Sequence, residues 1–100
     1  MQMRQFGIES AKARREAEQI RTVIVDLECT AQLLDCEIAA EELRAQVFKP
    51  TNVAYPILAK SLAARRDNLN GTIAALEKQL AAIHAALSKE GEELESNLLA

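Results

Sequence analysis

The nine residues Phe48–Pro56, FKPTNVAYP, decide the fold of this 100-residue chain. They contain both of its prolines and two of its three aromatic residues. Pro50 cannot continue a helix, and it biases the residue before it away from helical geometry. Thr51 or Asn52 can cap a following helix, and with Asn52 as the cap Pro56 falls in the first turn, where its missing N–H costs little. The stretch is therefore expected to be the turn between two helices.

A heptad repeat lies on both sides of this turn. Before it, mostly apolar residues recur at alternating spacings of four and three: Phe6, Ser10, Ala13, Ala17, Ile20, Ile24, Leu27, Ala31, Leu34, Ile38, Glu41 and Ala45. After it, the pattern returns in Tyr55, Ala59, Leu62, Arg66, Leu69, Ile73, Leu76, Leu80, Ile83, Leu87, Glu90 and Leu94. Such a long seam predicts a coiled coil. Phe48 and Tyr55 are expected to close the end of the seam as a plug.

The two halves predict an all-α fold, a two-helix antiparallel coiled-coil hairpin that forms a single domain over residues 1–100. The first helix is expected over about residues 6–47, the turn over about 48–53 and the second helix over about 54–98. Two alternatives stay open. Asn70-Gly71 is a common turn signal and would give a three-helix bundle, although Leu69 and Ile73 keep the heptad in phase across it. A homodimer would give a four-helix bundle.

Charge and side-chain size suggest the register of the two helices. If the turn centres near Asn52, residues whose numbers sum to about 104 face each other. Glu41 then comes near Arg65 and Arg66, while Ala31 meets Ile73 and Ala17 meets Leu87. The basic residues near the start lie beside residues near the end: Lys12, Arg14 and Arg15 beside Lys89, Glu90, Glu92 and Glu93. Opposite charges and complementary sizes both favour this pairing.

Composition argues against several classes of protein. The net charge of −3 gives no global attraction to nucleic acid, so no nucleic-acid partner is expected. No apolar run approaches the ~20 residues that cross a bilayer, and the first ten residues contain no apolar segment of a signal peptide. Cys29 and Cys36 would lie roughly 10 Å apart on one helix, too far for a mutual disulfide. A reduced cytoplasmic protein is the simplest interpretation.

A second apolar stripe follows the first helix, away from the seam. It consists of Thr22, Val25, Cys29, Leu33, Cys36, Ala40, Leu43 and Val47. A two-helix hairpin does not require these residues to be apolar, so the stripe predicts a docking face for another protein or for a second copy in a homodimer or larger bundle. The second helix offers a low surface in Ala74, Ala75, Ala81, Ala82, Ala85 and Ala86.

Charge is segregated around the turn. Between Thr22 and Leu43 there is no basic residue, but there are six acidic ones: Asp26, Glu28, Asp35, Glu37, Glu41 and Glu42. From Leu43 to Arg66 there is no acidic residue, but there are five basic ones: Arg44, Lys49, Lys60, Arg65 and Arg66. The pattern indicates either a positive tip that enters an acidic partner or touches phosphate, or ordinary solvated helix charge.

Catalysis has little support in the sequence. His84 is the only histidine, and its place beside the seam indicates a partly exposed structural residue. Two thiols and one histidine do not make a structural zinc site, and no glycine-rich phosphate loop is present. We therefore expect no enzymatic activity, no metal and no cofactor.

Four short segments resemble the FliJ family of flagellar export proteins, in its alphaproteobacterial form. They are Arg14–Ile20, Glu37–Glu42, Ala54–Tyr55–Pro56 with Ala59–Lys60, and Arg65–Leu69. The resemblance covers roughly residues 14–95, and the turn and the RRDNL segment are its most specific parts. The remainder is generic coiled coil.

This resemblance implies a non-enzymatic stalk or adaptor of type III protein export. Such a protein inserts into the ring of the flagellar export ATPase, promotes assembly of that ring, contacts the export gate protein and handles export chaperones. It would be cytoplasmic and only peripherally associated with the inner membrane, at the flagellar base. The partner-binding candidates are Tyr55, Arg65, Arg66 and Asp67, which carry the resemblance, and Val25, Cys29, Leu33 and Cys36 of the second stripe.

Overall fold

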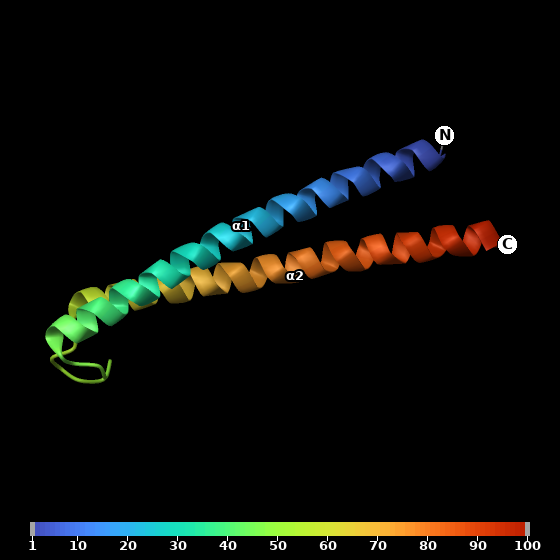
Figure 1. Ribbon diagram of the computed structural model, residues 1–100. Helices are drawn as coiled ribbons and strands as arrows, with labels where there is room; N and C mark the ends of the chain where they lie inside the picture. Colours follow the sequence, from blue (N-terminus) through green and yellow to red (C-terminus); the bar gives the residue numbers. More distant parts are fainter. Residues whose placement is uncertain (1, 100) are drawn as a thin grey trace. The chain divides into compact units, whose positions relative to one another are not determined.

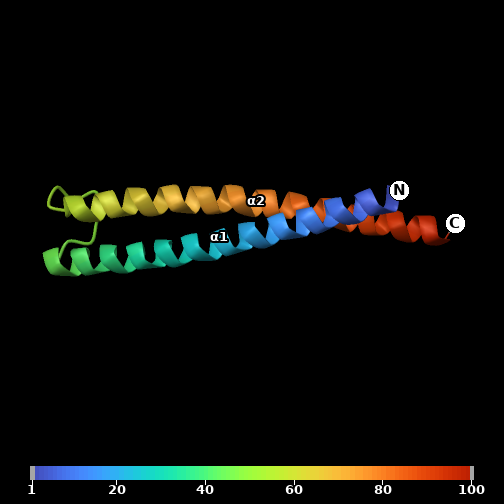
Figure 2. The same cartoon turned by 90° about the horizontal axis from the view of Figure 1, so that it is seen from above.

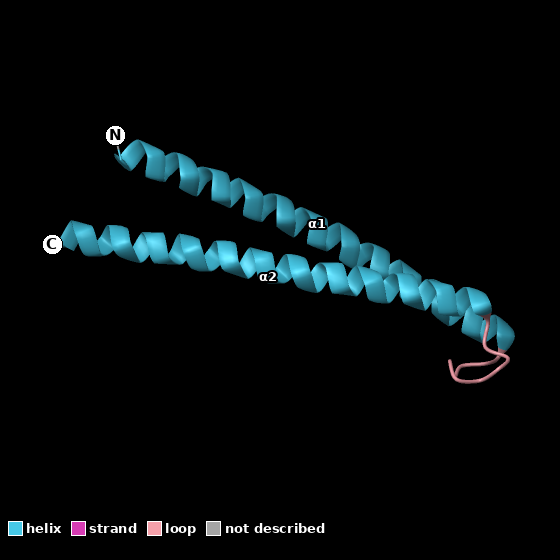
Figure 3. Ribbon diagram, turned by 180° about the vertical axis from the view of Figure 1, so that it is seen from behind, coloured by secondary structure: helices cyan, strands magenta, loops and turns pink. Residues whose placement is uncertain are grey.

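A computed structural model describes the backbone of residues 2–99 and the side chains of residues 9–92. The chain is all-α, as expected, and consists of two long helices that pack antiparallel. Helix α1 spans Gln2–Ala45 and helix α2 spans Ile57–Leu99. Residues 46–56 connect them and form the only non-helical segment among the described residues (Figures 1 and 3).

Both helices contribute to two compact units. The first unit combines Met1–Ile24 with Ala75–Ala100, and the second unit is the continuous hairpin Val25–Ala74. Over their described residues, neither helix carries a stretch apolar enough to span a bilayer.

In the hairpin unit, the core is built from the predicted seam. Ile38, Tyr55 and Ala59 form a buried cluster, and Ala59 is completely inaccessible to solvent. The half-buried side chains of Val47, Leu62 and Ala63 pack against this cluster. Figure 2 shows the two helices of this unit side by side next to their connection. Each helix contributes a single row of seam residues to this core. The unit therefore buries little apolar surface for its length, which limits the stabilisation that burial provides.

In the other unit, the same heptad places small and branched side chains between the helices. Ala17, Ile20 and Ile24 of α1 are buried, and Leu80, Ile83 and Leu87 of α2 are half-buried. Ser10 donates a hydrogen bond to Oε2 of Glu90 over 2.8 Å and links the two helices.

The predicted seam is confirmed throughout the described side chains. The seam residues of both helices between 10 and 90 are all buried or half-buried. Phe6 and Leu94, which the heptad also includes, lie outside the described side chains.

Helix α1 ends earlier than the sequence predicts, and not because of Pro50. Gln46 adopts a left-handed backbone with φ of 56° directly after Ala45. The Gln46 amide donates to the Leu43 carbonyl and the Val47 amide donates to the Glu42 carbonyl, each over 3.3 Å. This is the Schellman pattern, which satisfies the last carbonyl groups of a helix and turns the chain away.

The connection consists of two successive turns. The Asn52 amide donates to the Lys49 carbonyl over 3.0 Å, and the Tyr55 amide donates to the Asn52 carbonyl over 3.1 Å. Oδ1 of Asn52 accepts a bond from the Ala54 amide over 2.9 Å. The expectation that Asn52 caps α2 is therefore wrong, because its side chain closes the turn within the connection. The Pro56 carbonyl instead accepts the first bond of α2, from Lys60 over 3.2 Å.

Gly71 does not break the second helix. Helix α2 runs through Asn70-Gly71 without interruption, Gly71 has no positive φ, and a Cβ built on it would meet no atom within 4 Å. The three-helix alternative is therefore wrong.

The register differs in detail from the prediction. Arg66 was expected near Glu41, but its Nη1 donates to Oδ1 of Asp35 over 2.9 Å. Glu41 instead pairs with Arg44 on its own helix over 2.8 Å, since residues three apart face each other on a helix. Ala17 and Leu87 do come together, since they line one groove.

Candidate partner-binding surfaces

The second apolar stripe of α1 is exposed, as predicted. Within the hairpin unit it comprises Val25, Cys29, Leu33, Cys36, Ala40 and Leu43, hereafter the outer stripe. Its largest residues, Val25, Leu33 and Leu43, are 56%, 65% and 68% exposed. Of the two remaining residues of the predicted stripe, Thr22 is exposed in the other unit. Val47 is half-buried against the core cluster.

Cys29 and Cys36 are both exposed and both have free thiols. The prediction that they do not pair with each other is confirmed. Both lie on the outer stripe, where a thiol packs as a small apolar group.

A second exposed apolar surface was not predicted. It consists of four residues of the hairpin unit, hereafter the tip: Phe48 and Val53 in the connection, and Ile57 and Leu58 at the start of α2. Val53 is fully exposed, and the side chains of Phe48, Ile57 and Leu58 are 58%, 82% and 53% exposed. The expectation that Phe48 closes the seam is therefore wrong, because Tyr55 alone fills that position. The signal that could have revealed the tip is that Val53, Ile57 and Leu58 fall off the heptad.

The segment that contains the tip has only basic charged residues, and one of them, Arg44, pairs with Glu41. The exposed cations Arg44, Lys49, Lys60 and Arg65 lie in the segment between Leu43 and Arg66, which has no acidic residue. An apolar surface with a basic rim attracts acidic partners and can bury its apolar side chains against them.

Tyr55 is a structural residue rather than an exposed contact. Its ring lies in the buried cluster with Ile38 and Ala59, and its hydroxyl donates to Oε2 of Glu42 over 3.0 Å. Burial raises the pKa of the phenol, the bond to Glu42 adds to this, and the positive charge of Arg66 opposes it. Tyr55 therefore anchors the start of α2 to the end of α1.

Arg66 is engaged both with Asp67 beside it and with α1. The Nε and Nη2 atoms of Arg66 donate to Oδ1 of Asp67, and its Nη1 donates to Asp35. The hydrogen bond to Asp35, followed by the one to Asp67, raises the pKa of the guanidinium. Arg65, by contrast, is exposed on α2. Of the two arginines of the RRDNL segment, Arg65 is thus the one better placed to meet a partner.

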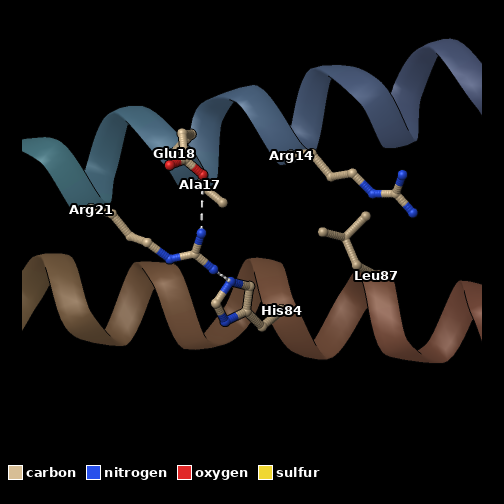
Figure 4. A pocket seen from close by; sticks show the side chains of 6 residues that line it. All are labelled: Arg14, Ala17, Glu18, Arg21, His84 and Leu87. Atoms are coloured by element: carbon tan, nitrogen blue, oxygen red, sulfur yellow. Dashed lines mark hydrogen bonds and ion pairs between the residues drawn. The ribbon is translucent and has the colours of Figure 1, made fainter.

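The other unit contains a groove between the helices (Figure 4). Arg14, Ala17, Glu18 and Arg21 line it from α1, and His84 and Leu87 line it from α2. Arg21 donates to Nε2 of His84 over 2.7 Å and pairs with Glu18 over 3.1 Å. Because a guanidinium can only donate, Nε2 of His84 is the acceptor of this bond. His84 thus joins the two helices, and it is more exposed than predicted.

The described residues contain no group of three or more histidine, cysteine, aspartate or glutamate side chains placed to hold a metal ion. The six residues that line the groove include no hydroxyl or thiol nucleophile. The candidate functional sites are therefore two surfaces that could bind another protein, the outer stripe and the tip.

Comparisons with known proteins do not assign the chain to a family. No protein-family model matches the chain, and no curated protein or solved structure matches it.

Proposed function

We propose that this chain is a non-enzymatic coiled-coil stalk or adaptor of flagellar type III protein export. In this role it promotes assembly of the export ATPase ring and couples that ring to the export gate and to export chaperones. The proposal rests on the resemblance of the turn and the RRDNL segment, together with one structural observation. The hairpin unit ends in a tip of four exposed apolar side chains within a segment that has five basic residues and no acidic ones.

The tip suits insertion into an acidic cavity of a partner. In the hairpin unit the two helices pack against each other, and the exposed Val53 and Ile57 present apolar surface where the chain reverses. Burying such side chains contributes about 1.5–3 kcal/mol each, and the lysines around them accelerate encounter with an acidic partner.

The test measures the ATPase rate of the cognate export ATPase as increasing amounts of this chain are added. Ring formation is followed in parallel on a sizing column. The wild-type chain is expected to raise both the rate and the ring population. A Val53→Ser/Ile57→Ser variant, which changes only exposed positions, is expected to lose most of this effect.

Matched lysine variants separate the tip from general charge. One variant is Lys60→Gln, which changes a residue close in sequence to the tip. The other is Lys78→Gln, which changes a residue further along the same helix, and both lysines are exposed. Lys60→Gln is expected to weaken the stimulation, and Lys78→Gln is expected to leave it unchanged. If the wild-type chain changes neither rate nor ring population, the proposal fails, and a homodimeric helical scaffold of unrelated role takes its place.

A further inference from the structure

We propose that the outer stripe binds an amphipathic helix of another protein, one whose apolar side chains are flanked by lysine or arginine. This inference concerns α1 alone and does not depend on a role in flagellar export. It uses a different surface from the tip.

The spacing of the outer stripe selects a helix as its occupant. Successive residues from Val25 to Leu43 are separated by four, four, three, four and three positions. This is the spacing that presents one continuous face of a helix, and it matches the knobs and holes of a second helix. The face lies opposite the seam, so α2 leaves it uncovered, and its large side chains are more than half exposed. Cys29, Cys36 and Ala40, which lie among the large residues of the stripe, have small side chains and allow a second helix to approach closely.

Charge selects the kind of helix. Of the six acidic residues between Thr22 and Leu43, three are engaged within the chain: Asp35 with Arg66, Glu41 with Arg44, and Glu42 with Tyr55. Asp26, Glu28 and Glu37 are exposed and have no basic neighbour in this segment. At about 100° of rotation per residue, Asp26 and Glu37 border one side of the outer stripe and Glu28 borders the other. A partner with cations at its flanking positions would meet carboxylates on both sides.

The same charges argue against a second copy of this chain as the occupant. In a twofold dimer formed by two outer stripes, the segment Thr22–Leu43 would face itself. That segment has no cation, so carboxylates would meet carboxylates on both flanks. Like charges at such flanking positions disfavour pairing.

The experiment uses two synthetic three-heptad peptides, each with leucine at its a and d positions. One carries lysine at every flanking position, and the other carries glutamate there. Binding of fluorescently labelled peptide to the full chain is measured by anisotropy. The lysine peptide is expected to bind at least about tenfold more tightly than the glutamate peptide.

Two variants with the same chemical change locate the site. Leu33→Asp changes a residue of the outer stripe. It is expected to weaken binding of the lysine peptide at least about tenfold, because it removes a leucine side chain that the bound peptide would cover. Leu58→Asp, at the tip, is expected to leave the affinity within about twofold. Both variants add a negative charge, so a general attraction between opposite charges would instead strengthen binding in both. Circular dichroism checks that the helical content is unchanged, which the exposure of both leucines predicts.

A charge exchange completes the test. Glu28→Lys/Glu37→Lys is expected to reverse the preference in favour of the glutamate peptide. Equal affinity for the two peptides, or an unchanged affinity of Leu33→Asp, would overturn the proposal. It would also be overturned if sedimentation showed a dimer of the wild-type chain that Leu33→Asp dissociates, since a second copy would then cover the stripe.

Discussion

Replacing Gln46 with glycine is expected to stabilise the chain, although glycine usually destabilises a helical protein. Gln46 has φ of 56°, a left-handed conformation that costs a residue with a Cβ roughly 1–2 kcal/mol. Glycine avoids this cost but loses about 0.5–1 kcal/mol more conformational entropy on folding. The difference predicts that the free energy of unfolding rises by about 0.5–1 kcal/mol. The exposed side chain of Gln46 makes no core contact that the substitution would remove.

Gln32→Gly is the matched control. Gln32 is also exposed, but it lies within α1, where glycine is expected to lower the free energy of unfolding by about 0.5 kcal/mol. Both variants change the unfolded chain in the same way, so the difference between them, roughly 1–1.5 kcal/mol, reports the native backbone. Urea unfolding followed by circular dichroism measures both. If Gln46→Gly destabilised the chain as much as Gln32→Gly, Gln46 would be helical, α1 would continue towards Pro50, and the tip would be built differently.

Two further predictions concern Gly71 in α2 and Tyr55 in the connection. Gly71→Ala is expected to raise the free energy of unfolding by about 1 kcal/mol, because Gly71 is exposed, helical and has open space for a Cβ; a decrease in urea unfolding would contradict the continuous helix. The pKa of Tyr55 is raised above its ordinary value of 10.0, chiefly by burial and then by Glu42, so folding favours the neutral phenol. Its contribution to stability is therefore complete below about pH 10 and is lost as the pH rises through the raised pKa. Tyr55→Phe should lack this alkaline loss, and an equal loss in both proteins between about pH 8 and the raised pKa would refute the assignment.

The heptad predicted the seam because side-chain periodicity is a local property of the sequence. Positions as different as Ala17, Arg66 and Glu90 were assigned to the seam by spacing alone, and each is buried or half-buried. A helix that repeats every seven residues must turn the same positions towards its partner, whatever their chemistry. The same arithmetic placed Val25 and Leu33 on the exposed outer stripe.

The connection could not be predicted in the same way, because its backbone does not follow a period. Gln46 carries no signal for a left-handed cap, which glycine or asparagine would have given. Pro50 offered a more obvious stop for α1, so the helix was expected to extend to about residue 47. Asn52 was recognised as a capping residue, but its side chain bonds to Ala54 in the turn rather than to α2. The heptad shows that Val53, Ile57 and Leu58 lie off the seam, but their place beside the connection depends on where the helices end.

Some of the predicted partner-binding residues are buried or half-buried and others are exposed. A sequence resemblance does not distinguish between these two groups. Tyr55 and Arg66 sit on the heptad, and the structure engages both with residues of α1, namely Glu42 and Asp35. A residue can therefore carry a resemblance because it holds the hairpin together rather than because it contacts a partner. Arg65, one position away and off the seam, is exposed.

The outer stripe and the tip are adjacent in sequence but opposite in charge, and this difference limits how one chain can serve as an adaptor. In the two proposals, the acidic residues beside the outer stripe would repel an acidic partner, and the basic residues around the connection would attract it. A basic helix has the reverse preference. In the two proposals, each surface would thus use the same segregation of charge to attract one class of partner and to reject the other. If the chain bridges two proteins through these surfaces, the two proteins must present opposite charges, and neither can displace the other by occupying the wrong surface.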